Sequence, residues 1–418
     1  MIQTSDGGYA LTGHTISSGG VEGGEDFWLI KTDAYGTAVW NRTYGGASLD
    51  VAYSVVQTDD GGFALGGETW SFGTGWDNAW LVKTDDKGII EWNQTYSRSN
   101  YSPAFSLAKT SDGGYVLAGR TASERNFGDG DFWIIKTDSF GRMQWDNAYG
   151  GPGEETAHSV VQTIDGGYAI TGLTNSFGEG GFDTWLVKTD SNGEMEWNHT
   201  YGGANDDWAT SIGQIGANGY MFSGYTRSFG EGAADFWLVK TDNLGNVEWN
   251  ETYGGKSEDI AASFAQTTDG GYALAGFTES FGVGSRDFWL IKIGPTEILA
   301  TVDIDPDTLN LKSNGEWITC YIELSAGFNV GDIDTSTILL NGTIGVDLGA
   351  PTQIGDYDCD GMADLMVKFD RSTVIEWLRL ADYSQYTGKS LDVNLEITGM
   401  AAGTPFEGVD TVKVLLKG

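Results

Sequence analysis

Short stretches in which apolar and polar residues alternate follow one another along the first 292 residues of the chain. One unit, DFWLIKTDAYGTAVWNRTYGG (residues 26–46), returns as DNAWLVKTDDKGIIEWNQTYS, DFWIIKTDSFGRMQWDNAYGG, DTWLVKTDSNGEMEWNHTYGG and DFWLVKTDNLGNVEWNETYGG, and then in the shortened form DFWLIKIG. One tryptophan in each copy marks a period of 52 or 53 residues: Trp28, Trp80, Trp133, Trp185, Trp237 and Trp289. No segment of the repeats keeps the period of a helix, so the pattern predicts strands.

Each full repeat contains four predicted strands, as the second copy illustrates. Its strands cover residues 52–58, 63–69, 78–84 and 89–96, and the turns between them are rich in Asp and Gly. Asp caps backbone amides in such turns, and Gly accepts positive φ angles. A four-stranded unit of about 50 residues is typical of a β-propeller blade, whereas the repeats of a β-solenoid, the alternative, are usually shorter.

The copies of the repeat are not all complete. Six copies of the second and third strands are present but only five of the fourth, because the last copy continues into Ile293-Gly294-Pro295 after Lys292. We therefore expect an all-β fold that starts with a β-propeller over residues 1–295, with six blades of four strands each. The last outer strand is expected from a segment upstream of Met1, and seven or eight blades remain the alternative.

The long connections of the repeats are expected on one face of the propeller and the tight turns on the other. Each indole is predicted to pack between blades, where it covers roughly 150–250 Å²; stacking on a ligand is the alternative. The face with the long connections carries five phenylalanines and four acids: Phe72, Phe127, Phe177, Phe229, Phe281, Asp50, Glu155, Asp207 and Asp259. These residues either close the loops or form a shallow binding face for a glycan or a cation.

The repeats stop near residue 296, and the composition shifts to alternating Val, Ile, Leu, Thr and Asp. We predict a linker over residues 296–301 and a small antiparallel β-sandwich over residues 302–418. The expected strands cover residues 317–324, 336–343, 365–370, 391–398 and 411–417, and residues 372–383 are expected to contain one short helix.

An acidic loop in this module has the spacing of a calcium site. It carries acids at positions 1, 3, 5 and 9, a glycine at position 6 and a backbone carbonyl at position 7: Asp356, Asp358, Asp360, Asp364, Gly361 and Met362. Ca²⁺ needs several oxygens about 2.3–2.6 Å away, held by a sharply turning backbone. The loop therefore predicts a bound Ca²⁺ with a structural role; an ordinary acidic turn is the alternative.

The loop departs from a full EF-hand. Val367 stands where the last glutamate would be, and a predicted strand follows in place of a helix. The remaining ligand is therefore expected from elsewhere in the module, and five residues are candidates that the sequence does not rank: Asp303, Asp305, Asp307, Asp332 and Asp334.

Composition restricts the partners. The chain has 59 acidic and 23 basic residues, a net charge of −36, which argues against nucleic acid and anionic membranes because both would repel it. No apolar run approaches the roughly 18 residues that span a membrane, and the chain starts without a secretory signal. Because Met1–Thr4 aligns with Val55–Thr58, we expect that an upstream segment carries the export signal.

Catalytic motifs are missing from the sequence. The three histidines, His14, His158 and His199, fall at unrelated positions of the repeat. No nucleophile elbow, phosphate loop or zinc-ligand spacing is present. A pair of acids could cleave glycosides, but the same acid recurs in four repeats. We therefore expect no catalytic residues, with a propeller glycoside hydrolase or lyase as the alternative.

Two families of secreted proteins resemble this chain. VDIDPDTLNLKSNGEWI, DIDTSTILLNG, DYDCDGMADLMVKFDR and GTPFEGVDTVKV resemble a β module found at the ends of archaeal and bacterial surface proteins. The repeats resemble the Trp-rich propeller repeats of similar exported proteins, many of them archaeal, and the acidic loop is similar to that of integrin-type FG-GAP repeats. The resemblance implies an extracellular or cell-surface location and attachment to the envelope, for example alongside an S-layer.

The chain departs from this resemblance at two positions. Related modules have a small aliphatic residue at Cys320 and Gly or Asn at Cys359, so the paired change suggests a Cys320–Cys359 disulfide; two free thiols are the alternative. N-x-S/T sequons, expected to carry glycans if the protein is exported, occur six times: Asn41, Asn93, Asn100, Asn198, Asn250 and Asn341.

The sequence thus predicts a monomeric, calcium-stabilised surface protein without enzymatic activity. Its propeller would serve adhesion, envelope assembly or ligand display, with an envelope component, a glycan or another surface protein as partner. A carbohydrate-binding protein that acts through the Phe-Gly-x-Gly face is the first alternative.

Overall fold

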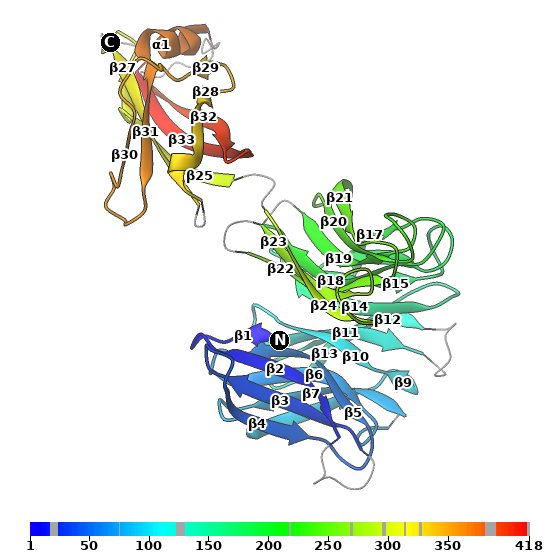
Figure 1. Cartoon of the computed structure of the whole chain (residues 1–418). Coiled ribbons are helices and arrows are strands. Elements are labelled where there is room, and N and C mark those ends of the chain that lie inside the picture. Colours follow the sequence, from blue (N-terminus) through cyan, green and yellow to red (C-terminus); the bar gives the residue numbers. More distant parts are fainter. Residues whose placement is uncertain are drawn as a thin grey trace. The chain divides into compact units, whose positions relative to one another are not determined.

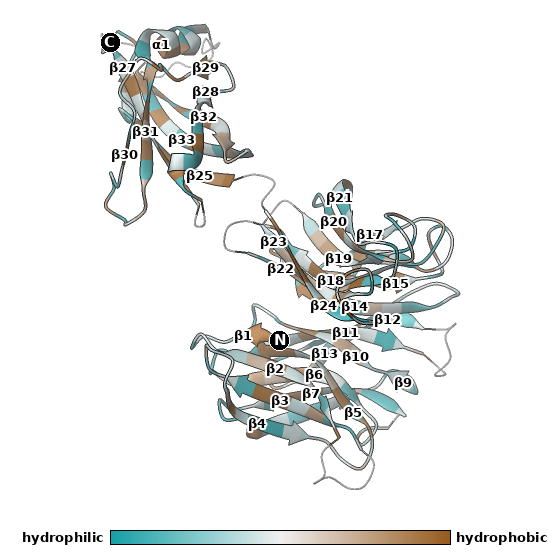
Figure 2. Ribbon diagram, viewed as in Figure 1, coloured by the Kyte–Doolittle hydropathy of each residue, from teal (hydrophilic) through white to brown (hydrophobic). Residues whose placement is uncertain are grey.

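A computed structural model gives the structure of the chain (Figure 1). It describes residues 1–418 except 17–23, 75, 123–129, 217–218, 268–270, 295–297, 313–314, 326–327, 381–389 and 416–418. Two compact units make up the chain: Met1–Phe264 with Leu274–Leu290, and Ala265–Ala273 with Ile291–Gly418. Apolar and polar residues alternate along the strands of both units (Figure 2), as the sequence pattern predicts.

Six consecutive antiparallel sheets form the blades of the propeller, so this part of the predicted fold is confirmed. The first two blades contain β1 (Ile2–Gln3), β2 (Tyr9–Thr15), β3 (Asp26–Thr32), β4 (Ala38–Tyr44), and β5 (Asp50–Gln57), β6 (Phe63–Thr69), β7 (Asp77–Thr84), β8 (Ile90–Tyr96), with β9 (Tyr101–Ser102) beside β7. The next two contain β10 (Ala104–Lys109), β11 (Tyr115–Thr121), β12 (Asp131–Thr137), β13 (Met143–Tyr149), and β14 (Glu155–Gln162), β15 (Tyr168–Thr174), β16 (Asp183–Thr189), β17 (Met195–Tyr201). The fifth contains β18 (Asp207–Gln214), β19 (Tyr220–Thr226), β20 (Asp235–Thr241) and β21 (Val247–Tyr253).

The sixth blade has three strands, β22 (Asp259–Gln266), β23 (Tyr272–Thr278) and β24 (Asp287–Ile293), as the shortened last repeat predicts. One face of β24 is uncovered: Phe288 is 76% exposed, whereas Phe236, at the same position of the fifth blade, is 0% exposed. Among the described residues no fourth strand pairs with β24. Completion of this blade from an upstream segment stays a prediction.

Aromatic rings hold neighbouring blades together. The Phe27 ring lies 4.5 Å from that of Trp80 in the next blade, and Phe132 and Trp185 repeat this contact at 4.8 Å. Trp80, Trp133, Trp185 and Trp237 are at most 3% exposed. The indoles of these four blades therefore pack in the joints, as predicted, and each contributes on the order of 4–6 kcal/mol of gross apolar burial.

In the first five blades the outer strand satisfies the indole N–H. Trp185 Nε1 donates to Asn198 Oδ1 at 3.0 Å, and Trp80 Nε1 donates to Asn93 Oδ1 at 3.2 Å. These asparagines belong to the Trp-Asn-x-Thr sequons and are exposed. The recurrence of the sequon thus has a structural cause, because a buried indole N–H needs an acceptor.

Tyrosines at the ends of the outer strands fix the tight turns of the following blade. Tyr44 Oη donates to the carbonyl of Gly88 at 2.8 Å, and Tyr201 Oη donates to that of Gly245 at 2.7 Å. Both glycines have a positive φ, of 76° and 84°. The Asp-x-x-Gly turns therefore serve the joints between blades as well as their own hairpins.

The C-terminal module is built on one path of strands, β29-β28-β32-β33-β25-β27-β31-β30. Its elements are β25 (Ile298–Asp305), β26 (Thr308–Asn310), β27 (Trp317–Leu324), η1 (Val330–Asp332), β28 (Ile333–Leu340), β29 (Ile344–Gly345), β30 (Gln353–Gly355), β31 (Asp364–Asp370), α1 (Arg371–Leu380), β32 (Ser390–Ala401) and β33 (Thr404–Leu415). Both halves of the path supply side chains to a single core, among them Ile304, Ile322, Val367 and Ile397. This arrangement is the predicted sandwich, and α1 is the predicted short helix.

Two details of the module differ from the prediction. The pairing is not entirely antiparallel, because β25 and β26 both run parallel to β33. The predicted linker at residues 296–301 is in part a strand, since β25 starts at Ile298, whose side chain is fully buried in the core. A single buried residue at a domain boundary leaves no periodic pattern, which is why the sequence did not reveal it.

Candidate functional sites

The acidic loop of the C-terminal module lies between β30 and β31 and brings its carboxylates together. Oxygens of Asp356, Asp358 and Asp364 lie within 4.8 Å of one another. The backbone turns sharply there, with a φ of 96° at Gly361 and 65° at Cys359. The spacing of the acids in the sequence therefore corresponds to a real convergence of oxygen atoms.

Hydrogen bonds within the loop hold these carboxylates in place. Tyr357 N donates to Asp364 Oδ2 at 2.8 Å, and Met362 N donates to Asp360 Oδ1 at 2.7 Å. Gly361 N donates to Asp356 Oδ2 at 3.2 Å. A carboxylate offers about four lone-pair positions, so each group retains capacity to bind a cation.

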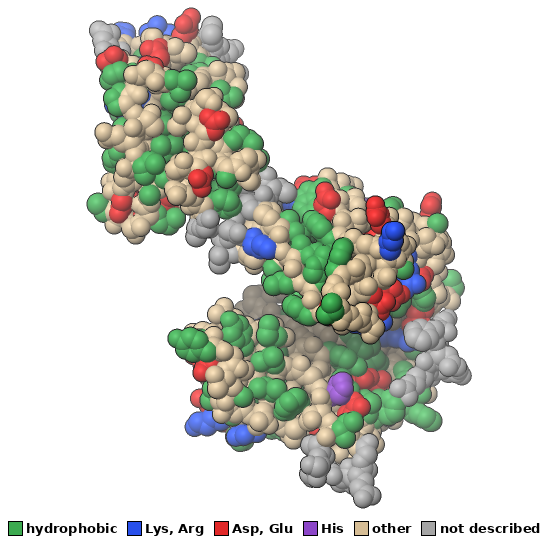
Figure 3. All heavy atoms as spheres, in the orientation of Figure 1, with side chains coloured by type: hydrophobic (Ala, Val, Ile, Leu, Met, Phe, Trp, Pro, Cys, Tyr) green, Lys and Arg blue, Asp and Glu red, His purple; other side chains and the backbone are tan. Residues whose placement is uncertain are grey.

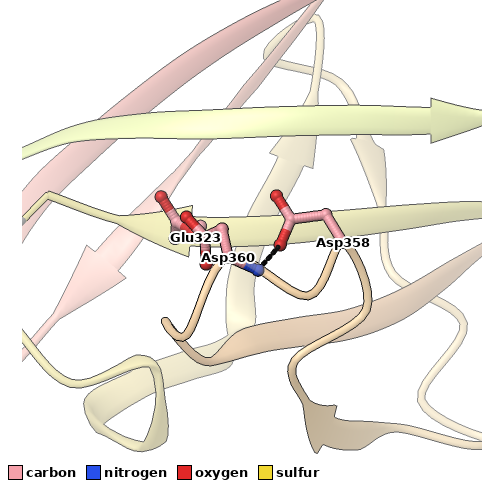
Figure 4. A group of neighbouring side chains, drawn as sticks. All are labelled: Glu323, Asp358 and Asp360. Carbon is pink, nitrogen blue, oxygen red and sulfur yellow. Dashed lines mark hydrogen bonds between the residues drawn. The ribbon is translucent and has the colours of Figure 1, made fainter.

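Glu323 joins the acidic loop from a neighbouring strand. One oxygen each from Glu323, Asp358 and Asp360 forms a second group within 4.8 Å, and the Glu323 and Asp360 carboxylates lie side by side (Figure 4). In the strand register Glu323 of β27 pairs with Asp364 of β31, which places it under the loop. The sequence analysis missed Glu323, because a lone glutamate in an alternating strand resembles any solvent-facing residue.

The structure separates the five candidates for the remaining calcium ligand into two groups. Asp303 and Asp305 of β25 line a cavity of about 250 Å³ together with Tyr321, Asp358 and Asp364. Asp307, Asp332 and Asp334 do not line this cavity. Asp334 instead accepts hydrogen bonds from its own neighbour Ser336, at 3.0 Å from N and 2.6 Å from Oγ.

The electrostatics of this acidic region are unfavourable without a counter-charge. Burial, and then the neighbouring carboxylate of Asp305, raises the pKa of Asp303. Burial, and then Asp360, raises the pKa of Glu323. The available donors are all hard carboxylate oxygens, which fit Ca²⁺ and do not fit a thiolate- or imidazole-preferring metal. Asp356, Asp358 and Asp364 would hold the ion, with Asp360 and Glu323 beside them.

The two cysteines of this module are free thiols in the structure, in contrast to the expected Cys320–Cys359 disulfide. Cys320 is 0% exposed in the core on β27, whereas Cys359 is exposed in the acidic loop. The alternation of β27 points Cys320 inward, away from the side of the sheet on which Tyr321 and Glu323 lie. Burial raises the pKa of the Cys320 thiol well above its usual value.

The predicted ligand face of the propeller has two layers. The four acids are the first residues of β5, β14, β18 and β22, beneath the loops, and are 0% exposed: Asp50, Glu155, Asp207 and Asp259. Asp207 Oδ2 accepts hydrogen bonds from Gly203 N at 2.8 Å and Ser228 Oγ at 2.7 Å, and its other oxygen accepts from Thr226. This arrangement matches the interpretation that the acids close the loops.

The phenylalanines form the outer layer. Phe72, Phe177, Phe229 and Phe281 are 40–49% exposed. One side of each ring packs on the tryptophan of its own blade, with ring centroids 5.3 Å apart for Phe177 and Trp185. Phe127 lies outside the described residues. The half-exposed rings leave this layer available as a binding face.

Asp207 and Asp259 each have a second buried carboxylate close by, Asp183 and Asp235. A side chain at Gly202 would meet Asp183 Oδ1 at 1.9 Å and Asp207 Oδ2 at 2.8 Å, so these carboxylates flank the glycine on both sides. Gly254 lies in the same way between Asp235 and Asp259. Burial, and to a lesser extent the Asp207 charge, raises the pKa of Asp183 to about 6. The Tyr-Gly-Gly motif thus marks the place where two acids meet.

Comparisons with known proteins add little to this description. No model of a protein family matches the chain, and no curated protein matches it. One solved structure that resembles it is the Neurospora crassa Pan2 WD40 domain, with 9% identity, a TM-score of 0.36 and coverage of 60% of this chain and 81% of that one. Another is a glucose dehydrogenase, with 12% identity, a TM-score of 0.39 and coverage of 67% of this chain and 95% of that one. The plexin A4 extracellular region resembles it at 6% identity (97% and 60%, TM-score 0.32).

These likenesses are too weak to carry an argument, and the strand pairing itself establishes the propeller. In the described part of the chain, no helix has both the length and the apolar character that a membrane crossing requires.

Proposed function

We propose that this chain is a non-enzymatic, calcium-stabilised protein of the cell surface that uses its propeller to bind an envelope component, a glycan or another surface protein. The observation that carries the proposal is the convergence of the Asp356, Asp358 and Asp364 carboxylates at the sharp turn of Gly361. Millimolar calcium is an extracellular condition, and loops of this type in extracellular modules bind with Kd of about 10⁻⁴–10⁻³ M. A surface location therefore fits such a site.

A structural role for the cation fits the position of the loop. The acidic loop runs directly into β31, whose residues Leu365, Val367 and Phe369 belong to the core of the module. A cation between the carboxylates would neutralise their repulsion and would fix the start of this strand. Binding to the folded state alone raises stability by mass action.

A non-enzymatic role is supported by the histidines and acids of the propeller. The loop acids that recur in the blades accept hydrogen bonds from the protein's own hydroxyl and amide groups, as Asp50 does from Ser71 Oγ at 2.8 Å and Gly46 N at 2.8 Å. Their repeated position and their burial fit an architectural role better than that of an acid–base pair. His14 and His199 lie in different strands, β2 and β17.

Calcium titration of the calcium-stripped full chain tests the proposal. Isothermal calorimetry is expected to give a Kd of about 10⁻⁴–10⁻³ M. Asp358→Asn and Asp364→Asn should each abolish the heat of binding. Asp334→Asn is the matched control, because the carboxylate of this aspartate accepts hydrogen bonds from Ser336 and does not line the acidic cavity. Absence of binding in the wild type, or equal binding in all variants, would refute the calcium site.

The location is tested separately. Antibody labelling of intact cells should reach the C-terminal module, and protease added outside should remove it. Protection from both reagents until the cells are lysed would contradict a surface role while leaving the calcium site standing.

The loop face is a second candidate for ligand binding. The exposed sides of the Phe72, Phe177, Phe229 and Phe281 rings form a repeated aromatic layer, and aromatic faces stack on sugar rings. Replacement of Phe177 and Phe229 by Ala should weaken glycan binding if this face is used.

A further inference from the structure

Three of the positions at which the repeats differ lie together in the structure. The third residue of the innermost strand segment is Ala in five blades: Ala52, Ala104, Ala157, Ala209 and Ala261. The residue after it changes in every blade: Tyr53, Phe105, His158, Thr210 and Ala262. The residue before this alanine also varies and is Trp208 in the fifth blade. The sixth residue of the second strand varies as well and is Glu68 in the second blade and Arg120 in the third. The blade structure therefore does not require a particular residue at these three positions.

A cavity of about 400 Å³ in the propeller is lined mainly by these variable positions: Glu68, Phe105, Arg120, Thr156, His158 and Trp208. The lining residues come from four successive blades, on strands β6, β10, β11, β14 and β18. The space-filling view shows that the propeller is hollowed on the side seen in this orientation (Figure 3). Cavities of this size, mostly apolar with a few polar groups, are typical of small-molecule sites.

Aromatic rings form one continuous wall of the cavity. The His158 ring stacks on Trp208, with centroids 6.2 Å apart and planes 17° from parallel, and it lies 6.0 Å from Phe105. Tyr53 continues the row 5.3 Å beyond Phe105. Burial lowers the pKa of His158 to about 4, so this ring is neutral at pH 7. The wall therefore offers neutral ring faces rather than charge.

Two polar groups in this wall have no partner. Among the described residues, His158 Nε2 and Trp208 Nε1 are buried without a hydrogen bond. A buried polar group without a partner costs about 1–3 kcal/mol. The indole N–H can only donate, so a ligand that satisfies it must offer an acceptor.

The charged groups of the cavity favour an uncharged ligand. Arg120 is held by Glu154 through two contacts, Nη1–Oε1 at 2.9 Å and Nη2–Oε2 at 3.0 Å, so its charge is already balanced. Glu68 and Asp77 add carboxylates to the lining and would repel an anion. An organic cation would suit the acids and the ring faces, but its ammonium group has no lone pair with which to accept the Trp208 N–H. A hydroxyl group can donate to a carboxylate and accept from the indole at once.

We propose that this cavity binds the pyranose ring of a sugar, with the ring carbons against Phe105, His158 and Trp208 and the hydroxyls on Glu68, Asp77 and the Trp208 N–H. The inference rests on the proposed binding role of the propeller and is independent of calcium. It places the ligand at the variable positions of the repeats, not at the loop phenylalanines. The sugar is either a free monosaccharide or the end of a glycan chain.

The test uses the calcium-free and the calcium-loaded full chain with two sets of probes. Glucose, galactose, mannose and N-acetylglucosamine represent free sugars, and the corresponding trisaccharides represent chain ends. Saturation-transfer NMR at millimolar ligand concentration identifies a bound sugar, and calorimetry measures its affinity. We expect at least one sugar to bind equally with and without calcium; binding of the trisaccharides alone indicates a chain end.

Variants separate this cavity from the loop face. Glu68→Gln, which keeps the size of the side chain, and Phe105→Leu, which removes the ring but stays apolar, should each weaken binding about tenfold, which corresponds to about 1.4 kcal/mol. An unchanged melting temperature confirms the fold. Tyr35→Ala, at a turn residue that is 95% exposed and does not line the cavity, is the control and should leave binding unchanged.

Three results would overturn the inference. The first is that no sugar binds; the second is that Phe177→Ala abolishes binding while Phe105→Leu does not. The third is that tetramethylammonium binds in place of every sugar. Loss of calcium binding with sugar binding intact would instead contradict the calcium proposal alone.

Discussion

The two parts of the molecule use acidic residues in opposite ways. In the propeller, Asp50 and Asp207 are fully buried, and each accepts hydrogen bonds from a threonine, a serine and a glycine amide. In the C-terminal module, Asp356, Asp358 and Asp364 turn their oxygens toward one another. The first set is satisfied by donors within the protein, whereas we propose that the second set binds a cation from outside.

The number of acids therefore does not by itself predict a cation site. A buried carboxylate with several donors is a loop closure, and its charge is stabilised by those hydrogen bonds. Carboxylates that converge on one point repel each other until a cation enters. The net charge of −36 contains both kinds of acid and distinguishes neither.

The largest expected effect concerns the aromatic joints, which should hold the propeller without any cation. Phe236 is 0% exposed and its ring lies 4.8 Å from Trp289, so Phe236→Ala should cost about 3–5 kcal/mol in the free energy of unfolding. Phe288→Ala, at the same repeat position but 76% exposed, should change it by less than about 0.5 kcal/mol. Urea unfolding in a chelator measures both; equal losses would mean that β24 is covered in solution.

Removal of a loop acid should have a smaller effect that calcium does not alter. Asp50→Ala leaves the Ser71 hydroxyl and the Gly46 amide without their acceptor and should cost about 2–3 kcal/mol. Asp86→Ala, on an exposed turn, is the control and should stay within about 0.5 kcal/mol. The loss caused by Asp50→Ala should be the same in calcium and in a chelator. If calcium stabilised the propeller of the wild type but not that of Asp50→Ala, the loop acids would be cation ligands and the contrast between the two sets of acids would be wrong.

Asp183 represents a third kind of acid, which is buried like the loop acids but has a raised pKa. Its pKa is raised from 3.8 to about 6 in the folded protein, so between these pH values the folded state binds a proton that the unfolded state has lost. Its contribution to stability is therefore present at low pH and is lost as the pH rises through about 6. Asp183→Asn should melt higher than wild type at pH 7, and the difference should shrink toward pH 4. A difference that is constant with pH would contradict the shift.

Much of the fold could be predicted from the sequence because the same local pattern of strands and turns recurs in six repeats. The strand alternation, the Asp-Gly turns and the period of Trp28 to Trp289 each point to the same blade. The acidic loop was likewise visible, since its ligands are close in sequence. Local patterns are thus sufficient wherever the partners are neighbours in the chain.

The remaining features depend on contacts between distant residues. Glu323 joins the acidic loop only through the pairing of β27 with β31, and Cys320 turns away from Cys359 through the alternation of β27. The cavity is lined by residues of four blades, so no single repeat contains its signal. The variable positions of the repeats carried that information, but only the structure shows that they meet.

Differential scanning calorimetry of the full chain with calcium and with a chelator tests the contrast between the two acidic sets most directly. The account predicts that calcium raises the melting transition of the C-terminal module by several degrees and leaves that of the propeller unchanged, and that Asp358→Asn removes the shift. A propeller transition that moves with calcium, or a module transition that does not, would contradict it.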